Sequence, residues 1–234
     1  MKNLAVFFAL FSVLYFVSCK PKTETYPFNE AKNYFPIVVG KYIAYQVDSI
    51  YFDNLTMTSD TFSWQERRLI DTAWIDAAGD SASRIIISIR DNDSMPWSNV
   101  KQWYCNYDAN TVQVVEENLR YIKLSSPVKK DVEWMGNQFI NATGSLEYLN
   151  GWNYKLTSVD QTESFKGLSF DLVSTVTQLD EENAIAKSYC VEKFQRGLGM
   201  IYKEQQFLTC NSLCNDWTHP ESGTIVKKYI LSHN

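Results

Sequence analysis

Alternation of apolar and polar residues along short segments is the feature that most limits what this chain can fold into. Ile43, Tyr45 and Val47 share one phase of segment 42–48, and the other phase is largely polar. The same pattern recurs in segments 85–90, 102–107 and 168–177. A period of two is typical of antiparallel strands that bury one face, because successive side chains point to opposite sides of a sheet. The sequence therefore predicts an all-β protein.

Turn-forming residues separate these segments. We expect tight turns at Asn150-Gly151, Asp108-Ala109-Asn110 and Gly197-Leu198-Gly199, since Asn, Asp and Gly tolerate the positive φ angles that hairpins need. The spacing predicts eleven to thirteen strands. Short helical segments are expected only near residues 29–33 and 178–183.

No long linker or low-complexity stretch divides residues 34–234, so this range is predicted to be a single antiparallel β domain. A sheet of this size must protect its edge strands. It can close into a lipocalin-like barrel or curve strongly into a half-barrel, and the sequence leaves both architectures open.

The first 18 residues predict export. Lys2 precedes an apolar stretch of about 14 residues, which fits a secretory signal peptide and is shorter than the roughly 20 residues of a membrane-spanning helix. The following Phe16-Val17-Ser18-Cys19 resembles a lipobox, in which the cysteine receives a lipid and becomes the mature N-terminus. Cys19 is therefore the expected lipidation site. The alternatives are an ordinary cleaved signal and a buried N-terminal helix.

Residues 19–33 are polar and contain Pro21 and Pro27, so this segment is predicted to be a flexible tether. Position 20 is Lys rather than the Asp that retains many lipoproteins in the inner membrane. The resemblance to lipoproteins without this Asp implies the outer membrane as the expected location. The tether also lacks the acidic run that sends some lipoproteins to the cell surface, so the periplasmic face is expected, with the membrane contacted only through the lipid anchor. The formal net charge of −5 argues against nucleic acid as a partner.

Four further cysteines, Cys105, Cys190, Cys210 and Cys214, remain after Cys19. An even number in an oxidising compartment predicts two disulfides, and three connectivities are possible. The expected arrangement is a local Cys210–Cys214 bridge together with a Cys105–Cys190 bridge between strands. Zinc held by Cys210, Cys214 and His219 is the alternative, although it lacks an obvious fourth ligand.

Three sets of segments resemble an uncharacterised family of Bacteroidetes lipoproteins. Residues 34–50 match a strand opening of the form YFPL-x-VG-x-YW-x-Y-x-VDS, residues 117–137 match ENLR, KL-x-FPV and W-x-GN, and residues 197–204 match VGLIYKE. The resemblance departs at Ser126, where the family favours Phe. It implies a shared architecture and location, but no activity.

Catalytic signatures are absent from the sequence: there is no nucleophile elbow, phosphate-binding glycine loop or HExxH motif. Two acid pairs, Asp91 with Asp93 and Glu116 with Glu117, could in principle serve a hydrolase, but both are expected to be solvated turn residues. Asp91-Asn92-Asp93 lacks the glycine and distal glutamate of a calcium loop. No metal or cofactor is expected.

Seven tryptophans lie after the signal segment, and most are expected to fill the core. Trp97, next to Pro96 in a predicted loop, is the candidate for an exposed ligand platform. Together these features predict a non-catalytic envelope lipoprotein that binds an apolar small molecule or an envelope protein. A structural subunit of an outer-membrane complex and a carboxylate-dependent hydrolase remain the alternatives.

Overall fold

The computed structural model describes residues 30–214 and 216–234, which form one antiparallel sheet of twelve strands. The strands are β1 (Tyr42–Asp53), β2 (Thr58–Ile75), β3 (Ser81–Arg90), β4 (Ser98–Tyr107), β5 (Thr111–Glu116), β6 (Leu119–Ser125), β7 (Glu133–Trp134), β8 (Tyr154–Phe165), β9 (Leu168–Glu182), β10 (Ala186–Gln195), β11 (Gly199–Thr209) and β12 (Ser222–His233). Two short 3₁₀ helices, η2 (Glu30–Tyr34) and η3 (Gly144–Leu149), accompany them. Within this part of the chain, no helix is long and apolar enough to cross a membrane.

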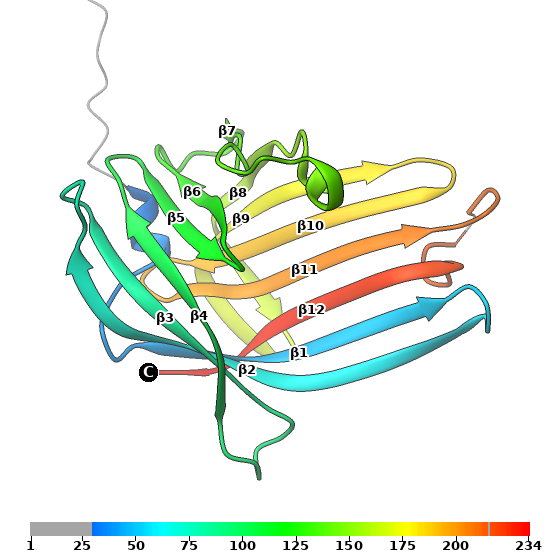
Figure 1. The fold of residues 1–234 in the computed structure, drawn as a ribbon, viewed down its shortest axis with the longest axis horizontal. Helices are drawn as coiled ribbons and strands as arrows, with labels where there is room; N and C mark the ends of the chain where they lie inside the picture. Colours follow the sequence, from blue (N-terminus) through cyan, green and yellow to red (C-terminus); the bar gives the residue numbers. More distant parts are fainter. Residues whose placement is uncertain (1–29, 215) are drawn as a thin grey trace, which may run out of the picture.

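The strands follow one another as two meanders that meet at β1 and β12. The order across the sheet is β6-β5-β4-β3-β2-β1-β12-β11-β10-β9-β8-β7, and every neighbouring pair is antiparallel. Figure 1 shows that the sheet curves strongly, so that its two ends approach each other. The expected all-β fold is confirmed, and the twelve strands fall within the expected number.

The two edge strands, β6 and β7, come together where the sheet nearly closes. The amide of Ile122 in β6 donates to the carbonyl of Gly136, just beyond β7, over 2.8 Å. The indole nitrogen of Trp134 donates to the carbonyl of Ile122 over 2.9 Å. Gly136 is required here, because a Cβ at this position would lie 2.4 Å from the Tyr154 ring. The sheet is therefore an almost complete barrel with a short seam.

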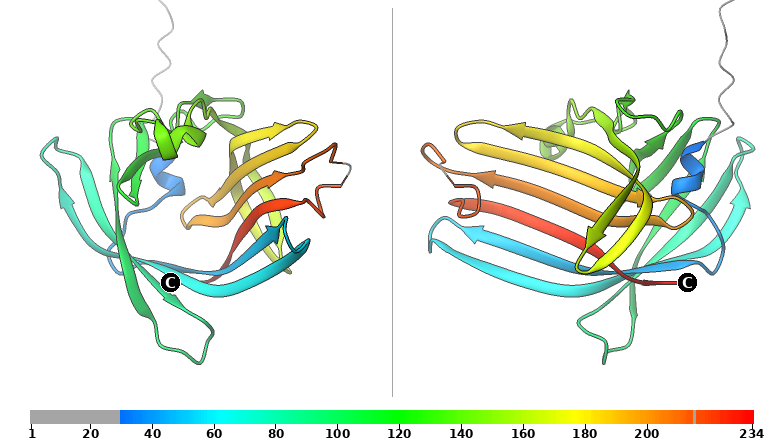
Figure 2. Two further views of the ribbon diagram at one scale, coloured as in Figure 1. Left: turned by 45° about the vertical axis from the view of Figure 1, so that its right-hand side comes forward. Right: turned by 180° about the vertical axis from the view of Figure 1, so that it is seen from behind.

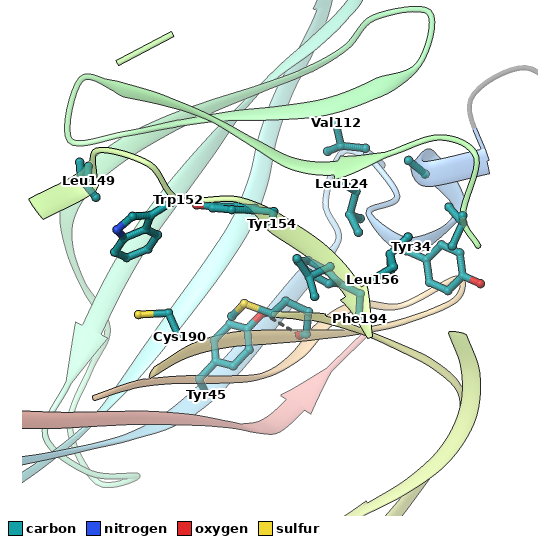
Figure 3. Packing of buried hydrophobic residues seen from close by; sticks show 14 of the residues in the cluster. Tyr34, Tyr45, Val112, Leu124, Leu149, Trp152, Tyr154, Leu156, Cys190 and Phe194 are labelled. Atoms are coloured by element: carbon teal, nitrogen blue, oxygen red, sulfur yellow. Dashed lines mark hydrogen bonds between the residues drawn. The ribbon is translucent and has the colours of Figure 1, made fainter. Parts of the chain in front are cut away.

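The strand side chains that point into the barrel form the core. Tyr45 and Val47 of β1 are 1% and 0% exposed, as the alternation predicted. Figure 3 shows Tyr45 beside Phe194 and Leu156, side chains that come from strands on the other half of the sheet. The Tyr45 hydroxyl donates to the carbonyl of Met200 over 2.9 Å, which satisfies its one polar group.

The hairpin formed by β8 and β9 bends over the outer face of the sheet (Figure 2). Its pairing contains three register shifts, and Asp160 and Leu172 adopt positive φ angles of 51° and 56°. The bend brings Phe165 into a parallel stack on Tyr202 of β11, with ring centroids 5.0 Å apart. A second, smaller core thus lies outside the barrel. The alternation predicted that Leu168 and Leu172 share one buried face of a strand. The bend interrupts that alternation, and both side chains are exposed.

The chain enters the barrel earlier than the sequence suggested. Residues 30–33 were expected in the tether, but η2 is packed in the core, with Ala31 0% and Tyr34 1% exposed. The folded domain therefore begins at Glu30 or before. The tether prediction for residues 19–29, the signal peptide and Cys19 lie outside the described residues. The buried core residues of the described part of the chain fall between 31 and 230, so this part carries a core of its own.

Residues 35–41, here called the strap, connect η2 to β1. Phe35, Pro36 and Ile37 are half-buried, and Val38, Val39 and Gly40 are exposed. The Tyr107 hydroxyl donates to the carbonyl of Phe35 and accepts a hydrogen bond from the amide of Ile37. Reciprocal backbone hydrogen bonds then tie the strap to Ile70 in β2. The strap is therefore fixed against one wall of the barrel interior.

Two local predictions need correction. The helix expected near residues 178–183 is wrong, because residues 178–182 form the end of strand β9. Their backbone pairs with β10. Asn150-Gly151 is a turn, with Gly151 at a φ of 76°, but it follows η3 instead of joining two strands. The turns at 108–110 and 197–199 join β4 to β5 and β10 to β11, as predicted.

Truncation of Tyr34 tests the role of η2. Tyr34 is fully buried, its hydroxyl contacts Asp160, and Arg196 donates to it over 2.8 Å. We expect Tyr34→Ala to lower the free energy of unfolding by about 3–5 kcal/mol, in the range of buried aromatic truncations. Urea denaturation of the chain from Lys20 onward measures this. The control is Tyr51→Ala, which removes a half-exposed ring and should change stability by less than about 0.5 kcal/mol. Equal effects of the two substitutions would contradict the role given to η2.

Candidate functional site

A belt of charged side chains crosses the barrel interior between the apolar clusters. It consists of three carboxylates and four cations from six strands: Glu66, Arg68, Glu116, Lys123, Glu192, Lys203 and Lys228. All seven side chains are at most 14% exposed. Charged groups are rarely buried unless they are paired, so each contact in this belt matters to the fold.

Lys123 joins the two halves of the sheet. Its ammonium lies 2.9 Å from Glu116 on the neighbouring strand β5 and 3.0 Å from Glu192 on β10, across the barrel. Lys203 of β11 contacts the same Glu192 oxygen, Oε1, at 3.1 Å. The second oxygen, Glu192 Oε2, is buried and has no hydrogen-bond partner among the described residues.

Glu66 anchors the other part of the belt. One carboxylate oxygen accepts a hydrogen bond from Arg68 Nε at 2.8 Å, and the other lies 2.6 Å from Lys228 Nζ. The Arg68 guanidinium also lies over two aromatic rings, with its carbon 4.7 Å from the Trp103 centroid and 5.1 Å from that of Tyr45. These contacts hold the guanidinium in one orientation.

The ionisation of the belt follows from burial and from the neighbouring charges. Burial alone would raise the pKa of Glu66, but Arg68 and Lys228 outweigh it and lower the pKa to about 2. Burial likewise opposes ionisation of Glu116, whose pKa is nevertheless lowered to about 2, chiefly by Lys123 and Lys203. The pKa of Lys228 falls to about 8, because burial and the nearby Arg68 charge together outweigh Glu66.

An apolar pocket opens beside this belt, between the strap and the sheet. Its cavity volume is about 50 Å³. The walls are mostly apolar side chains from the strap, β1, β2, β3 and the start of β11, and the full lining is Phe35, Pro36, Lys41, Tyr42, Ile43, Tyr45, Arg68, Ile70, Ile85, Leu198, Gly199 and Met200. The strap is thus part of the pocket wall.

A smaller chamber of about 10 Å³ continues from the pocket into the charged belt. Phe35, Arg68, Ile85 and Met200 line both spaces. The chamber also reaches Glu116, Lys123 and Glu192. A volume of this size holds about one water molecule. Arg68 therefore lies at the boundary between an apolar pocket and a charged interior.

One of the two predicted disulfides is confirmed and the other is wrong. Cys210 and Cys214 form the expected local disulfide. Cys105 and Cys190 are instead separate buried thiols in different apolar clusters, so the expected bridge between them is wrong. Cys105 is hydrogen-bonded to Ser83 at 3.0 Å. Burial raises the pKa of Cys105 to about 11 and that of Cys190 to about 12, so both stay protonated at neutral pH.

The zinc alternative loses its ligands to the disulfide, and His219 binds Asp216 at 2.7 Å. Within the part of the chain that the structure describes, no cluster of three or more His, Cys, Asp or Glu residues could hold a metal. Trp97 is half-buried outside the pocket, with the guanidinium carbons of Arg67 and Arg90 at 4.9 Å and 4.4 Å from its ring.

The acid pairs divide between surface and interior. Asp91 and Asp93 are exposed on the β3–β4 turn, and Asp93 contacts Arg90, as expected for solvated residues. Glu117 is also exposed and contacts Lys101 at 2.7 Å. Glu116 was expected on a solvated turn as well, and this is wrong, because its side chain points into the barrel and pairs with Lys123.

Most of the charged belt was not predicted, although the sequence contains a signal for it. Glu66 and Arg68 share the phase of Trp64, and Glu192 shares the phase of Cys190 and Phe194. A charged residue in the inward phase of a strand indicates either a buried network or a water-filled interior. Single-strand patterns cannot tell which strands face each other across a barrel.

No protein-family model matches this chain, and no curated protein sequence does either. The Bacteroidetes lipoprotein family therefore stays an expectation from the sequence. Among solved structures, the chain is similar to an exported-protein candidate from Bacteroides fragilis with a YmcC-like fold. The alignment covers 86% of this chain and 98% of that one, at 9% identity and a TM-score of 0.43. A similarity this low carries no inference about function.

The lowered pKa values of Glu66 and Glu116 make stability depend on pH. Each group titrates near pH 2 in the folded chain and near its ordinary value of 4.5 when unfolded, so the unfolded state binds more protons between these values. The stabilisation is complete above about pH 4.5 and is lost as the pH falls toward 2, by about 3 kcal/mol per group.

Urea denaturation between pH 6 and pH 2.5 measures this dependence. We expect the slope to be shallower for Glu66→Gln than for the unsubstituted chain, and unchanged for Glu147→Gln, which alters an exposed carboxylate. Parallel curves for all three proteins would contradict the buried pairing of Glu66.

Proposed function

We propose that this chain is a non-catalytic, exported lipoprotein whose β domain binds a small apolar ligand. The observation that carries the proposal is the pocket between the strap and the sheet, which combines apolar walls with access from outside. Ligand sites are commonly concave, mostly apolar and supplied with a few fixed polar groups. Ile70, Ile85 and Leu198 provide the apolar walls, and Arg68 provides the fixed polar group.

The size of the pocket limits the ligand. A cavity of about 50 Å³ is far smaller than the sites that hold drug-sized molecules. Each buried methylene of a ligand contributes about 0.8 kcal/mol, so a short chain would bind weakly. A weak, reversible ligand suits a binding or sensing module better than permanent storage.

In this proposal Cys19 carries the lipid, and residues 20–29 separate the lipid from the domain. Ten residues span at most about 35 Å when fully extended. The domain would then stand beside the membrane, at the periplasmic face of the outer membrane, and meet its ligand from the aqueous side. The membrane contact would be made by the anchor alone.

The charge state of the buried acids supports binding rather than hydrolysis. A glycosidase-type mechanism needs one carboxyl group that stays protonated near neutral pH. Glu116 and Glu192 lie closest to such a pair, because both contact Lys123. Burial works against their ionisation, but the neighbouring lysines lower the pKa of both. Both are therefore charged, and neither suits a general acid.

A second candidate function, docking onto an envelope partner, rests on a different observation. Three neighbouring turns at one end of the sheet each expose a large apolar side chain: Leu55 and Met57 between β1 and β2, Ile185 between β9 and β10, and Leu213 between β11 and β12 (Figure 1). Exposed apolar groups gathered in one region often mark contact surfaces. The two functions use separate parts of the domain and are compatible.

Titration with 1-hexanol tests the ligand proposal. The chain from Lys20 onward is followed by methyl NMR, and we expect saturable shifts at Ile70, Ile85 and Met200. Ile70→Trp fills the pocket and should weaken binding at least tenfold, whereas Val100→Trp adds the same ring at an exposed position and should not.

Thermal unfolding confirms that each variant is folded. Shifts scattered over the surface, or shifts that survive Ile70→Trp unchanged, would show that the strap pocket is not a ligand site. If Ile70→Trp does not fold, the map of shifted methyl groups in the unsubstituted chain decides the matter.

A further inference from the structure

The charges that line the strap pocket are all positive. Arg68 and Lys41 belong to its lining, and among the residues that the structure describes no carboxylate does. Lys41 is held by the carbonyl of Gly197, to which it donates over 2.6 Å. A ligand that enters this pocket therefore meets two cations and apolar walls.

Arg68 shares its carboxylate partner in the charged belt, Glu66, with a second cation, Lys228. The three carboxylates of the belt serve four cations, so at least one carboxylate must be shared, and in this belt two are. Glu66 is shared by Arg68 and Lys228, and Glu192 is shared by Lys123 and Lys203. The belt thus contains four cations and three carboxylates. An unbalanced charge among buried groups is costly, and an entering anion would relieve that cost.

The Arg68 guanidinium also has unused hydrogen-bonding capacity. Nε donates to Glu66, and Nη1 has only the Met200 sulfur at 4.0 Å. Nη2 has no acceptor among the residues that the structure describes. A planar guanidinium with free donors, fixed between Trp103 and Tyr45, matches the two oxygens of a carboxylate.

We propose that the ligand of the strap pocket is a short aliphatic carboxylate, whose carboxylate binds Arg68 and whose chain lies along Ile70, Ile85 and Leu198. This inference rests on the proposed ligand-binding function and names its chemical class. The smaller chamber limits how far the ligand can enter. The Lys123 ammonium in that chamber is already paired with Glu116 and Glu192, and these two carboxylates would repel the ligand's carboxylate, so it stops at Arg68.

A comparison of hexanoate with 1-hexanol tests this assignment, because the two share a chain and differ in charge. Binding to the chain from Lys20 onward is measured by methyl NMR at pH 7. We expect hexanoate to bind at least tenfold tighter than 1-hexanol. Arg68→Met should bring hexanoate to the affinity of 1-hexanol, and Arg84→Met, which removes a guanidinium on the outer face, should leave both affinities unchanged.

The outcomes separate the two proposals. If 1-hexanol binds and hexanoate binds no tighter, the carboxylate assignment fails and the apolar site stands. If neither binds, both proposals fail. If hexanoate binds tighter but loses its advantage in Lys41→Met and not in Arg68→Met, the carboxylate lies at Lys41 and the assignment to Arg68 is wrong. If Arg68→Met does not fold, the Arg Nε–Hε resonances of the unsubstituted chain show whether Arg68 responds to hexanoate and not to 1-hexanol.

Discussion

The contact of Lys123 with Glu192 is the interaction on which the rest of this structure depends. Lys123 lies on an edge strand of one meander and Glu192 on the other meander, so their 3.0 Å contact crosses the barrel. Hydrogen-bonded strand pairing does not join β6 to β7, and the seam has only two hydrogen bonds through Ile122. The buried ion pair therefore supplements a weak seam. Separation of the two meanders would leave Lys123 and Glu192 buried without this contact, which would cost several kcal/mol of stability. The ion pair therefore favours one relative position of the two halves of the sheet.

This arrangement also explains the location of the candidate site. The belt lies inside the barrel, and apolar side chains and strap residues separate it from solvent. At the strap the covering is incomplete, and the pocket there ends on Arg68. The guanidinium is held by Glu66 and by two aromatic rings, and it is thus both part of the structural network and available to a ligand. Arg68 therefore contributes both to the stability of the barrel and to the proposed ligand site.

The sequence predicted the features that depend on near neighbours. The phase of Tyr45 and Val47, the turns at 108–110 and 197–199 and the Cys210–Cys214 disulfide all follow from local pattern. It did not predict features that depend on which strands meet across the barrel. Cys105 and Cys190 were paired by count, yet they lie in different clusters, and Glu116 was placed in solvent although it faces Lys123. The packing of η2 was missed as well, because the polar segment 19–33 with two prolines gives no sign that Ala31 is buried.

A double-mutant cycle on Lys123 and Glu192 tests the central claim most directly. Urea denaturation of Lys123→Met, Glu192→Gln and the double variant gives the coupling free energy between the two side chains. If the ion pair holds the two halves of the sheet together, each single substitution leaves a buried charge unpaired, and the coupling should be about 2 kcal/mol or more. Additive effects, with a coupling below about 0.5 kcal/mol, would contradict the account, because the sheet would then close without this contact.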